Sequence, residues 1–349
     1  MKRIISFSAI LLGLVLLIFV LFQALPNASE NLVSQRTDAK TRAAIEQELG
    51  LNQPFGKQLL GYYNDLSPIS IYKSSNQKCK NLSGFSMAIG GDNRLWLKWP
   101  YLRTSFQTKQ TVSSMLISAF WGTMILAIAS MLFALLIGIP IGVLAAKTQG
   151  SWIDNSLVWL SALGISVPSF LSALLFSWLF GYVWASYTGL SMTGSLWELD
   201  PFSDSPDTVV YHWENLILPT LALGIRPLAV FVQLTRNTMV EILDQDFVRS
   251  AKAKGLSERA VIWKHAFPNA LNPLITSIGG WFSSLLAGSF FTEYIFQWRG
   301  LGKVTIEALQ QSDFPVVMGG VLFTACVFFI LHIVTEFLYV WIDPRVKYE

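Results

Sequence analysis

Four ionisable residues interrupt stretches of the sequence that are otherwise apolar, and they are the first candidates for chemistry: Arg226, Glu293, His332 and Glu336. An ionisable side chain is costly to bury in a lipid bilayer, so one that is kept there commonly serves a solute or proton path. Arg226 could meet a carboxylate on a solute, or it could pair with Glu293 or Glu336. The two glutamates lie near the ends of their stretches, where water lowers the cost of the charge, so a structural role is also open for them.

Residue types that build catalytic and metal sites are scarce. The chain has three histidines and two cysteines, Cys79 and Cys326, with no Cys-x-x-Cys pair, so we expect no metal site and no disulfide. Residues 26–110 contain no histidine and no recognisable nucleophile and base pair, which argues against a membrane-anchored enzyme. The phosphate-binding pattern Gly-x-x-x-x-Gly-Lys-Ser/Thr is also missing. We therefore expect neither catalysis nor a cofactor bound by this chain.

The apolar stretches that would position these residues indicate a membrane protein. Hydrophobic residues make up 52% of the chain and charged residues 13%, with a mean hydropathy of +0.47. A helix crosses a bilayer with about 20 largely apolar residues. Six stretches meet this requirement: 4–25, 111–146, 155–197, 215–235, 270–292 and 314–342. The sequence therefore predicts an all-α polytopic membrane protein with about six transmembrane helices, the first being an uncleaved anchor.

The distribution of lysine and arginine predicts the orientation. Basic residues gather in the short segments that lie on the same side as the N-terminus, including Lys147 and Arg236, whereas residues 185–213 contain none. Short cytoplasmic loops carry this excess of positive charge. We expect both termini in the cytoplasm, a first helix over 1–25, a small loop-rich extracytoplasmic subdomain over 26–110 with a helix at 37–49, and a permease core over 111–349.

The cytoplasmic loop 237–272 has more helix signals than a plain connector needs. A helix from Asp246 should end at Gly255, which suits a left-handed C-terminal cap. Ser257 can cap a second helix, with Glu258 at its start. We expect Pro268 to limit that helix, and Asn272 with Pro273 to begin the fifth span. A helix lying on the membrane surface is the alternative reading, because Arg259, Trp263 and Lys264 suit lipid headgroups.

A family resemblance favours the helix-turn-helix finger. Residues 246–255 read DFVRSAKAKG and, after nine further residues, 265–268 read HAFP. This pattern resembles the EAA loop of ABC importer permeases, with His265 in place of the usual apolar residue. Its form is closest to the dipeptide, oligopeptide and nickel branch. Residues 48–54, 99–112, 293–302, 313–317 and 343–345 resemble the same branch, so the likeness covers nearly the whole chain.

The resemblance implies a pore-forming subunit of an ATP-driven importer in a bacterial inner membrane, with peptides as the commonest cargo. Its implied partners are a second permease, two cytoplasmic ATPase subunits that carry ATP and magnesium, and an extracytoplasmic solute-binding protein. The loop would seat on one ATPase through Asp246, Ala251, Ala253, Gly255, Ser257, Glu258, Arg259, Ile262, Trp263, His265 and Pro268. Of these, we expect residues 257–264 to supply the contact surface.

Two alternatives remain at this stage. An importer of the same type could carry nickel chelates, opines or oligosaccharides. A proton-coupled secondary carrier would instead use Glu293, His332 and Glu336 as a proton relay, and it would need no ATPase.

Overall fold

The structure is a computed structural model in which residues 2–24, 53–73, 84–199 and 208–342 are described. The predicted helix at 37–49 lies outside these residues. The chain forms two compact units. Unit 1 comprises residues 1–118 and 304–326, and unit 2 comprises residues 119–303 and 327–349. The predicted divisions after residues 25 and 110 remain a prediction.

Unit 1 contains the first helix, α1 (Lys2–Ala24), and a small α/β element. Helix α4 (Phe55–Leu66) precedes a three-stranded antiparallel sheet of β1 (Ile69–Lys73), β2 (Gly84–Gly90) and β3 (Asn93–Lys98), in the order β1-β3-β2. The expectation of a loop-rich segment is therefore wrong for these residues. A large aliphatic or aromatic side chain recurs at every second residue of each strand, as at Ile69 and Ile71, Phe85 and Met87, and Leu95 and Leu97. This period of two is the signature of a sheet with two different faces.

A buried ion pair fixes this element. Arg103 donates to Asp65 through Nη2 at 3.0 Å, and both side chains are buried. The Tyr72 hydroxyl donates to the other oxygen of Asp65 at 3.0 Å. Burial, and then the Asp65 charge, raise the pKa of Tyr72, so its hydroxyl remains a neutral donor.

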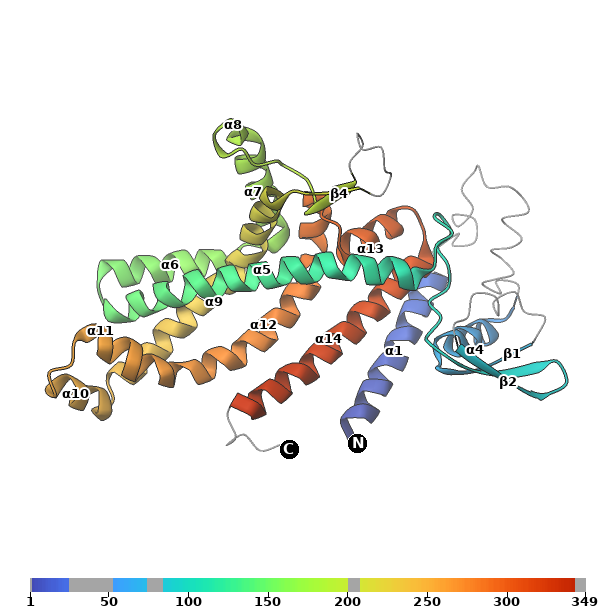
Figure 1. The fold of residues 1–349 in the computed structure, drawn as a ribbon, viewed down its shortest axis with the longest axis horizontal. Coiled ribbons are helices and arrows are strands. Elements are labelled where there is room, and N and C mark those ends of the chain that lie inside the picture. Colours follow the sequence, from blue (N-terminus) through green and yellow to red (C-terminus); the bar gives the residue numbers. More distant parts are fainter. Residues whose placement is uncertain (1, 25–52, 74–83, 200–207, 343–349) are drawn as a thin grey trace. The chain divides into compact units, whose positions relative to one another are not determined.

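Unit 2 holds most of the apolar helices (Figure 1). Helix α5 (Val112–Lys147) begins in unit 1 and runs through Pro140 as one helix of 36 residues. Two helices follow, α6 (Trp152–Ser166) and α7 (Ser169–Trp178), and a π-helical segment Leu179–Val183 leads to the short α8 (Ala185–Thr188). Strands β4 (Trp197–Leu199) and β5 (Val209–Tyr211) form a two-stranded sheet.

The second half of the chain is largely helical as well. A 3₁₀ turn, Trp213–Leu216, leads into α9 (Ile217–Leu243), and α10 (Asp246–Ala253) and α11 (Glu258–Ala260) follow. A π-helical segment Val261–Ala266 joins α11 to α12 (Phe267–Phe296). Helix α13 (Leu301–Gln310) and helix α14 (Phe314–Ile342) complete the described chain.

Among the described residues, four helices are long and apolar enough to cross a membrane. They correspond to the predicted spans at 111–146, 215–235, 270–292 and 314–342. Helices α6 and α7 together form a fifth candidate, bent by 102°. Pro168 explains the bend, because a residue before proline avoids the helical region, and Val167 has a ψ of 124°. In α1, residues Ala9–Val20 form a shorter apolar helix. The all-α polytopic membrane fold is confirmed, while the count of six and the position of the termini remain predictions.

Close helix packing forms the core of unit 2. Leu126, Phe231 and Leu285 are buried together with the Trp298 side chain. At Gly142, a Cβ atom would lie 2.5 Å from Thr235 Cβ and 2.7 Å from the Val232 carbonyl oxygen, so only glycine permits this approach of α5 to α9. This is the small-residue packing expected of membrane helices.

Candidate functional site

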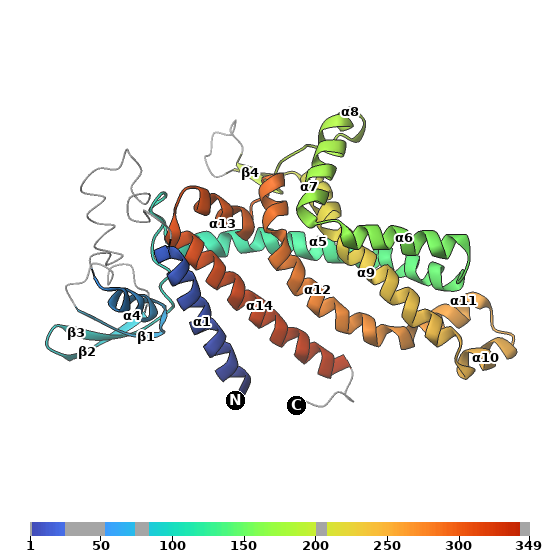
Figure 2. The ribbon, with the colours of Figure 1, turned by 180° about the vertical axis from the view of Figure 1, so that it is seen from behind.

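The predicted finger, residues 246–268, lies between α9 and α12 and includes the start of α12 (Figures 1 and 2). Its first helix, α10, begins at Asp246 and ends at Ala253. Gly255 follows with a φ of +76°, and its N–H donates to the Lys252 carbonyl at 3.0 Å. This left-handed conformation costs a residue with a Cβ about 1–2 kcal/mol. The glycine that ends the first helix was correctly predicted.

The second half of the finger begins as predicted and then differs. The Ser257 Oγ accepts from the Ala260 N–H at 3.4 Å, which caps α11. Pro268 does not end this helix; it lies in the first turn of α12, where its missing N–H is tolerated. Pro273 lies inside α12 and does not begin it. The finger therefore continues without a break into the fifth predicted span, as one helix of 39 residues from Glu258 to Phe296.

One side of the finger is buried. Val248, Ala251, Val261 and Ile262 pack with Val143 and Ala146 of α5 and with Met239 and Ile242 of α9, in an apolar cluster. Ile262 is 7% exposed, so the expectation that residues 257–264 all face a partner is wrong at Val261 and Ile262. Burial of this face explains how a short loop keeps a fixed position on the helices.

The opposite side is exposed and mixes apolar with basic residues. Phe247, Leu256 and Trp263 are large apolar side chains that stay exposed. Asp246, Ala253, Gly255, Ser257, Glu258, Arg259 and Pro268 are also exposed, together with Arg249, Lys252, Lys254 and Lys264, while His265 is half-buried. Phe247 and Leu256 were not among the predicted contacts. In the sequence, each of them could have been recognised as a large apolar residue close to charged ones, Phe247 beside Asp246 and Leu256 near Lys254.

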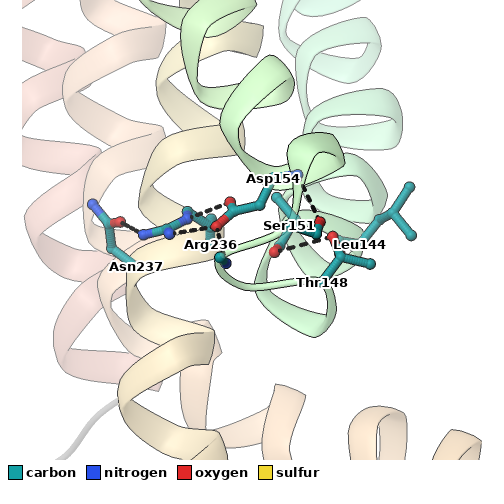
Figure 3. A network of polar contacts seen from close by, with 8 residues as sticks. Leu144, Thr148, Ser151, Asp154, Arg236 and Asn237 are labelled. Carbon is teal, nitrogen blue, oxygen red and sulfur yellow. Dashed lines mark hydrogen bonds and ion pairs between the residues drawn. The ribbon is translucent and has the colours of Figure 1, made fainter.

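An ion pair anchors the finger end of the bundle (Figure 3). Arg236 of α9 donates from Nε to Asp154 Oδ1 at 2.8 Å and from Nη2 to Asp154 Oδ2 at 2.7 Å. The Asp154 side chain is only 1% exposed. Two parallel bonds between guanidinium and carboxylate fix orientation as well as distance. Helix α6 is thereby tied to α9 ten residues before the finger starts.

The turn before α6 supports this anchor. The Ser151 Oγ accepts from the Asp154 N–H, and Asp154 Oδ2 accepts from the Gly150 N–H at 2.9 Å. Sequence reasoning missed Asp154 and considered Arg236 only for topology. Ser151 with Asp154 three residues later is the capping pattern that could have revealed the turn. A second ion pair, Lys147 Nζ to Glu258 Oε2 at 3.0 Å, joins α5 to α11 at the surface.

Of the predicted pathway residues whose side chains the structure describes, Arg226 and Glu293 contact different partners. The Arg226 guanidinium lies over the Trp281 ring, 6.0 Å from its centroid. His332 is exposed on α14, and the Glu336 side chain lies outside the part that the structure describes. Whether these residues line a path remains a prediction.

Glu293 has a placement that favours a different role. Its side chain is fully buried at the C-terminal end of α12. Oε1 accepts from the Ser289 hydroxyl at 2.8 Å, and Oε2 accepts from the Gly302 and Lys303 N–H groups at 2.7 and 3.3 Å. These N–H groups open α13, where a helix has unsatisfied donors. In this structure the Glu293 carboxylate caps a helix and is not open to a solute.

The residues that follow α12 are held by similar contacts. The buried Trp298 donates from Nε1 to the Gly122 carbonyl at 2.9 Å, and the Leu301 N–H donates to Thr123 Oγ1 at 2.8 Å. Sequence reasoning did not identify Thr123 or Trp298 as members of this site. With the finger at one end of α12 and this turn at the other, both ends of the helix have defined positions in unit 2.

Comparison with known proteins identifies the family of this chain. Residues 138–348 match the family model described as binding-protein-dependent transport system inner membrane component. The chain belongs to this family. The permease is therefore a multi-pass inner-membrane protein, and the expectations of an ABC importer permease and of its membrane location are confirmed.

Similar permeases extend the match over the whole chain. The dipeptide transport system permease protein DppB of Alkalihalophilus pseudofirmus is 31% identical, covering 100% of this chain and 98% of that protein. DppB of Escherichia coli is 35% identical over 75% of this chain and 84% of its own length. The glutathione transport system permease protein GsiC of Salmonella choleraesuis is 30% identical, covering 100% and 98%.

One solved structure supports the fold of this permease. It is an inward-facing conformation of the MetNI methionine ABC transporter, with a TM-score of 0.50 and 16% identity, covering 65% of this chain and 95% of that one.

Proposed function

We propose that this permease forms half of the translocation pore of an ATP-driven importer of di- or oligopeptides, with the finger as the site that couples it to a separate ATPase. The family match supports the transport class, and the names of the similar permeases support the cargo. Nickel chelates, opines and oligosaccharides are the competing cargoes. A proton-coupled carrier is less well supported, because the Glu293 carboxylate is fully buried and already accepts hydrogen bonds from Ser289, Gly302 and Lys303.

The observation that carries this proposal is the two-sided finger. One face is locked to α5 and α9 by buried apolar side chains, and the other presents Phe247, Leu256 and Trp263 among basic residues. Exposed large apolar side chains are depleted from free surfaces and enriched in the centres of protein interfaces. The exposed face thus suits a groove on a partner protein, while the buried face transfers the partner's motion to the helices.

The remaining partners follow from the same proposal. A second, related permease would complete the pore, two cytoplasmic ATPase subunits would bind ATP and magnesium, and a binding protein would deliver the solute to the extracytoplasmic side. In this arrangement both termini and the finger are cytoplasmic. The permease itself binds no nucleotide and hydrolyses nothing.

The first test is purification of the tagged full-length chain from its native membrane in mild detergent, followed by identification of the bound subunits and measurement of ATP hydrolysis. We expect a second permease and an ATPase to copurify. Leu256→Asp should remove the ATPase while leaving the second permease, because it places a charge in the exposed apolar tip of the finger. Recovery of the chain alone, without ATP hydrolysis, would contradict the proposal.

Leu309→Asp is the matched control. Leu309 is an exposed leucine on α13, at 58% exposure compared with 41% for Leu256. It lies outside the finger, so this variant should keep both subunits. Equal loss of the ATPase in the two variants would show a general effect of the added charge. Uptake of labelled dipeptides, compared with nickel chelates, in proteoliposomes containing the recovered binding protein then distinguishes the cargoes.

A further inference from the structure

The sheet in unit 1 has one face made of apolar side chains that nothing in the described chain covers. Its members come from all three strands and their immediate flank: Ile69, Ile71, Phe85, Met87, Leu95, Leu97 and Trp99. Leu95 is half-buried, and the other six side chains are between 57% and 82% exposed. Soluble surfaces rarely carry so many large apolar side chains side by side, so this face is an interaction surface.

The strand register makes the face continuous. Leu97 of the central strand β3 is paired with Ile69 on one side and Phe85 on the other. Leu95 is paired in the same way with Ile71 and Met87. Side chains directly opposite each other on one face of a sheet are about 4.5–5.5 Å apart. Leu95, Leu97 and their four paired neighbours therefore form two adjacent rows of side chains, none of which is charged.

The opposite face, which includes Ala88 and Trp96, is fixed to α4 by its polar side chains. The Ser70 hydroxyl donates to the Asn64 carbonyl at 2.6 Å, the Tyr72 hydroxyl donates to Asp65, and Lys98 Nζ donates to the Asp65 carbonyl oxygen. The apolar face consequently looks away from α4. The sheet has the same division into an apolar and a polar side that lets an amphipathic helix lie in a membrane surface.

Helix α4 in turn lies along α1. The Phe55 ring is edge-on to Phe19 with centroids 5.5 Å apart, and the Tyr63 hydroxyl donates to the Leu12 carbonyl at 2.8 Å. Leu12 and Phe19 are separated by about 10 Å along the helix axis, from the middle of α1 toward its C-terminal end. Other α1 side chains, among them Ile10 and Leu17, are apolar and exposed. The α4 and sheet element is thus held at the level of the C-terminal half of an apolar, lipid-facing helix.

We propose that the apolar sheet face rests in the lipid leaflet around the C-terminal half of α1, at the boundary between headgroups and acyl chains. The exposed side chains of this face and those of α1 are apolar alike. This shared character favours lipid over a soluble protein as the partner of the face. Trp99 lies at the end of the face, and tryptophan is enriched at the headgroup level. Strand β3 is paired on both sides, so only the outer edges of β1 and β2 need partners from headgroups and water. With the topology proposed above, this is the outer leaflet.

Nitroxide labelling of neighbouring positions on β2 tests the proposal. Met87→Cys places a label on the apolar face, and Ala88→Cys, the matched control, places one on the other face of the same strand, where Ala88 is also exposed. Both changes are made in the full-length chain with Cys79→Ser and Cys326→Ala, reconstituted in nanodiscs of phosphatidylethanolamine and phosphatidylglycerol. The measurement compares the collision rate of each label with oxygen, which enters lipid, and with a water-soluble nickel chelate.

We expect an oxygen to nickel collision ratio several-fold higher at Met87→Cys than at Ala88→Cys. Ile71→Cys gives an independent reading from β1 and should behave as Met87→Cys does. High nickel collision rates at both faces would place the sheet in water and overturn the proposal. Protection of the Met87→Cys label from both reagents would also overturn it, because a protein partner would then cover the face. The experiment measures no transport, so its failure is separate from failure of the proposed function.

Discussion

Among the described residues of unit 2, two carboxylates are buried, those of Asp154 and Glu293, and they are stabilised in different ways. Asp154, 1% exposed, receives two hydrogen bonds from the Arg236 guanidinium at the finger end of the bundle. Glu293, 0% exposed, is bound by a hydroxyl and by backbone N–H groups at the other end of α12. The first carboxylate joins two helices through residues that are 82 positions apart in the sequence, whereas the second closes a turn between adjacent elements.

Each of the two sites depends on its neighbours in a different way. Removing one partner of a buried ion pair leaves an uncompensated charge, which is far more costly than losing a neutral hydrogen bond. The finger end should therefore be sensitive to single charge changes, while the Glu293 end should tolerate any side chain that can still accept hydrogen bonds. The predictions below test this contrast.

The largest effect is expected for Arg236→Met. This change leaves the Asp154 charge buried without a cation, so the free energy of unfolding should fall by about 3–5 kcal/mol. Thermal unfolding of the purified chain in detergent measures the loss. The double variant Asp154→Asn with Arg236→Met should recover part of it, since no isolated charge remains. If Arg236→Met were as stable as the natural protein, the proposed difference between the Asp154 and Glu293 sites would be wrong.

Replacement of Glu293 should have a smaller effect that depends on the substituent. Glu293→Ala leaves the Ser289, Gly302 and Lys303 donors without an acceptor, and it should cost about 1–3 kcal/mol. Glu293→Gln keeps one acceptor oxygen for the backbone groups and should retain most of the stability. The same thermal measurement on both variants tests the prediction. Equal losses from the two changes would mean that the charge itself, and not the acceptor, stabilises the turn.

Gly255→Asp should separate stability from coupling. The variant must adopt a φ near +76°, which aspartate tolerates better than most residues, so the stability loss should be about 1 kcal/mol. We expect ATP hydrolysis to continue without solute uptake in proteoliposomes of the whole complex. Ser250→Asp, an exposed change on α10 that adds the same charge, is the control and should keep uptake. Normal transport by Gly255→Asp would contradict the role of the finger.

The smallest effect is expected at the surface pair between Lys147 and Glu258. Both side chains are substantially exposed, at 45% and 60%, so Glu258→Gln should cost less than about 1 kcal/mol. The difference from the natural protein should disappear in high salt, because mobile ions screen exposed charges. An effect as large as that of Arg236→Met would show that exposure does not explain the contrast between these pairs.

Local signals predicted the finger well. The positive φ of Gly255 and the Ser257 cap each depend on residues within one helical turn, so the sequence contains the whole cause. The predictions that Pro268 limits the second helix and that Pro273 begins the fifth span were wrong. Proline restricts the turn before it, and both the first turn of α12 and a long membrane helix can accommodate that restriction, as Pro268 and Pro273 do.

Features that depend on distant parts of the chain could not be predicted in this way. Nothing near Asp154 indicates that Arg236 neutralises it, and nothing near Ile262 shows that α5 and α9 cover it. The sheet was missed because its strands are short and lie among serine, asparagine and glycine residues. The alternation of Ile69 and Ile71 with Ser70 and Tyr72 was nevertheless visible, and it would have indicated a strand with two different faces.

The helical run from Glu258 to Phe296, which includes the π-helical segment Val261–Ala266, is long enough to act as a lever. Its 39 residues correspond to a rod of about 58 Å, nearly twice the thickness of the hydrocarbon core. A rod of this length converts each degree of tilt into a displacement of about 1 Å at its far end. Rigid elements of this kind can carry energetic coupling between distant sites. A small rotation imposed on the finger would therefore displace the turn that Glu293 caps, at the other end of this helical run.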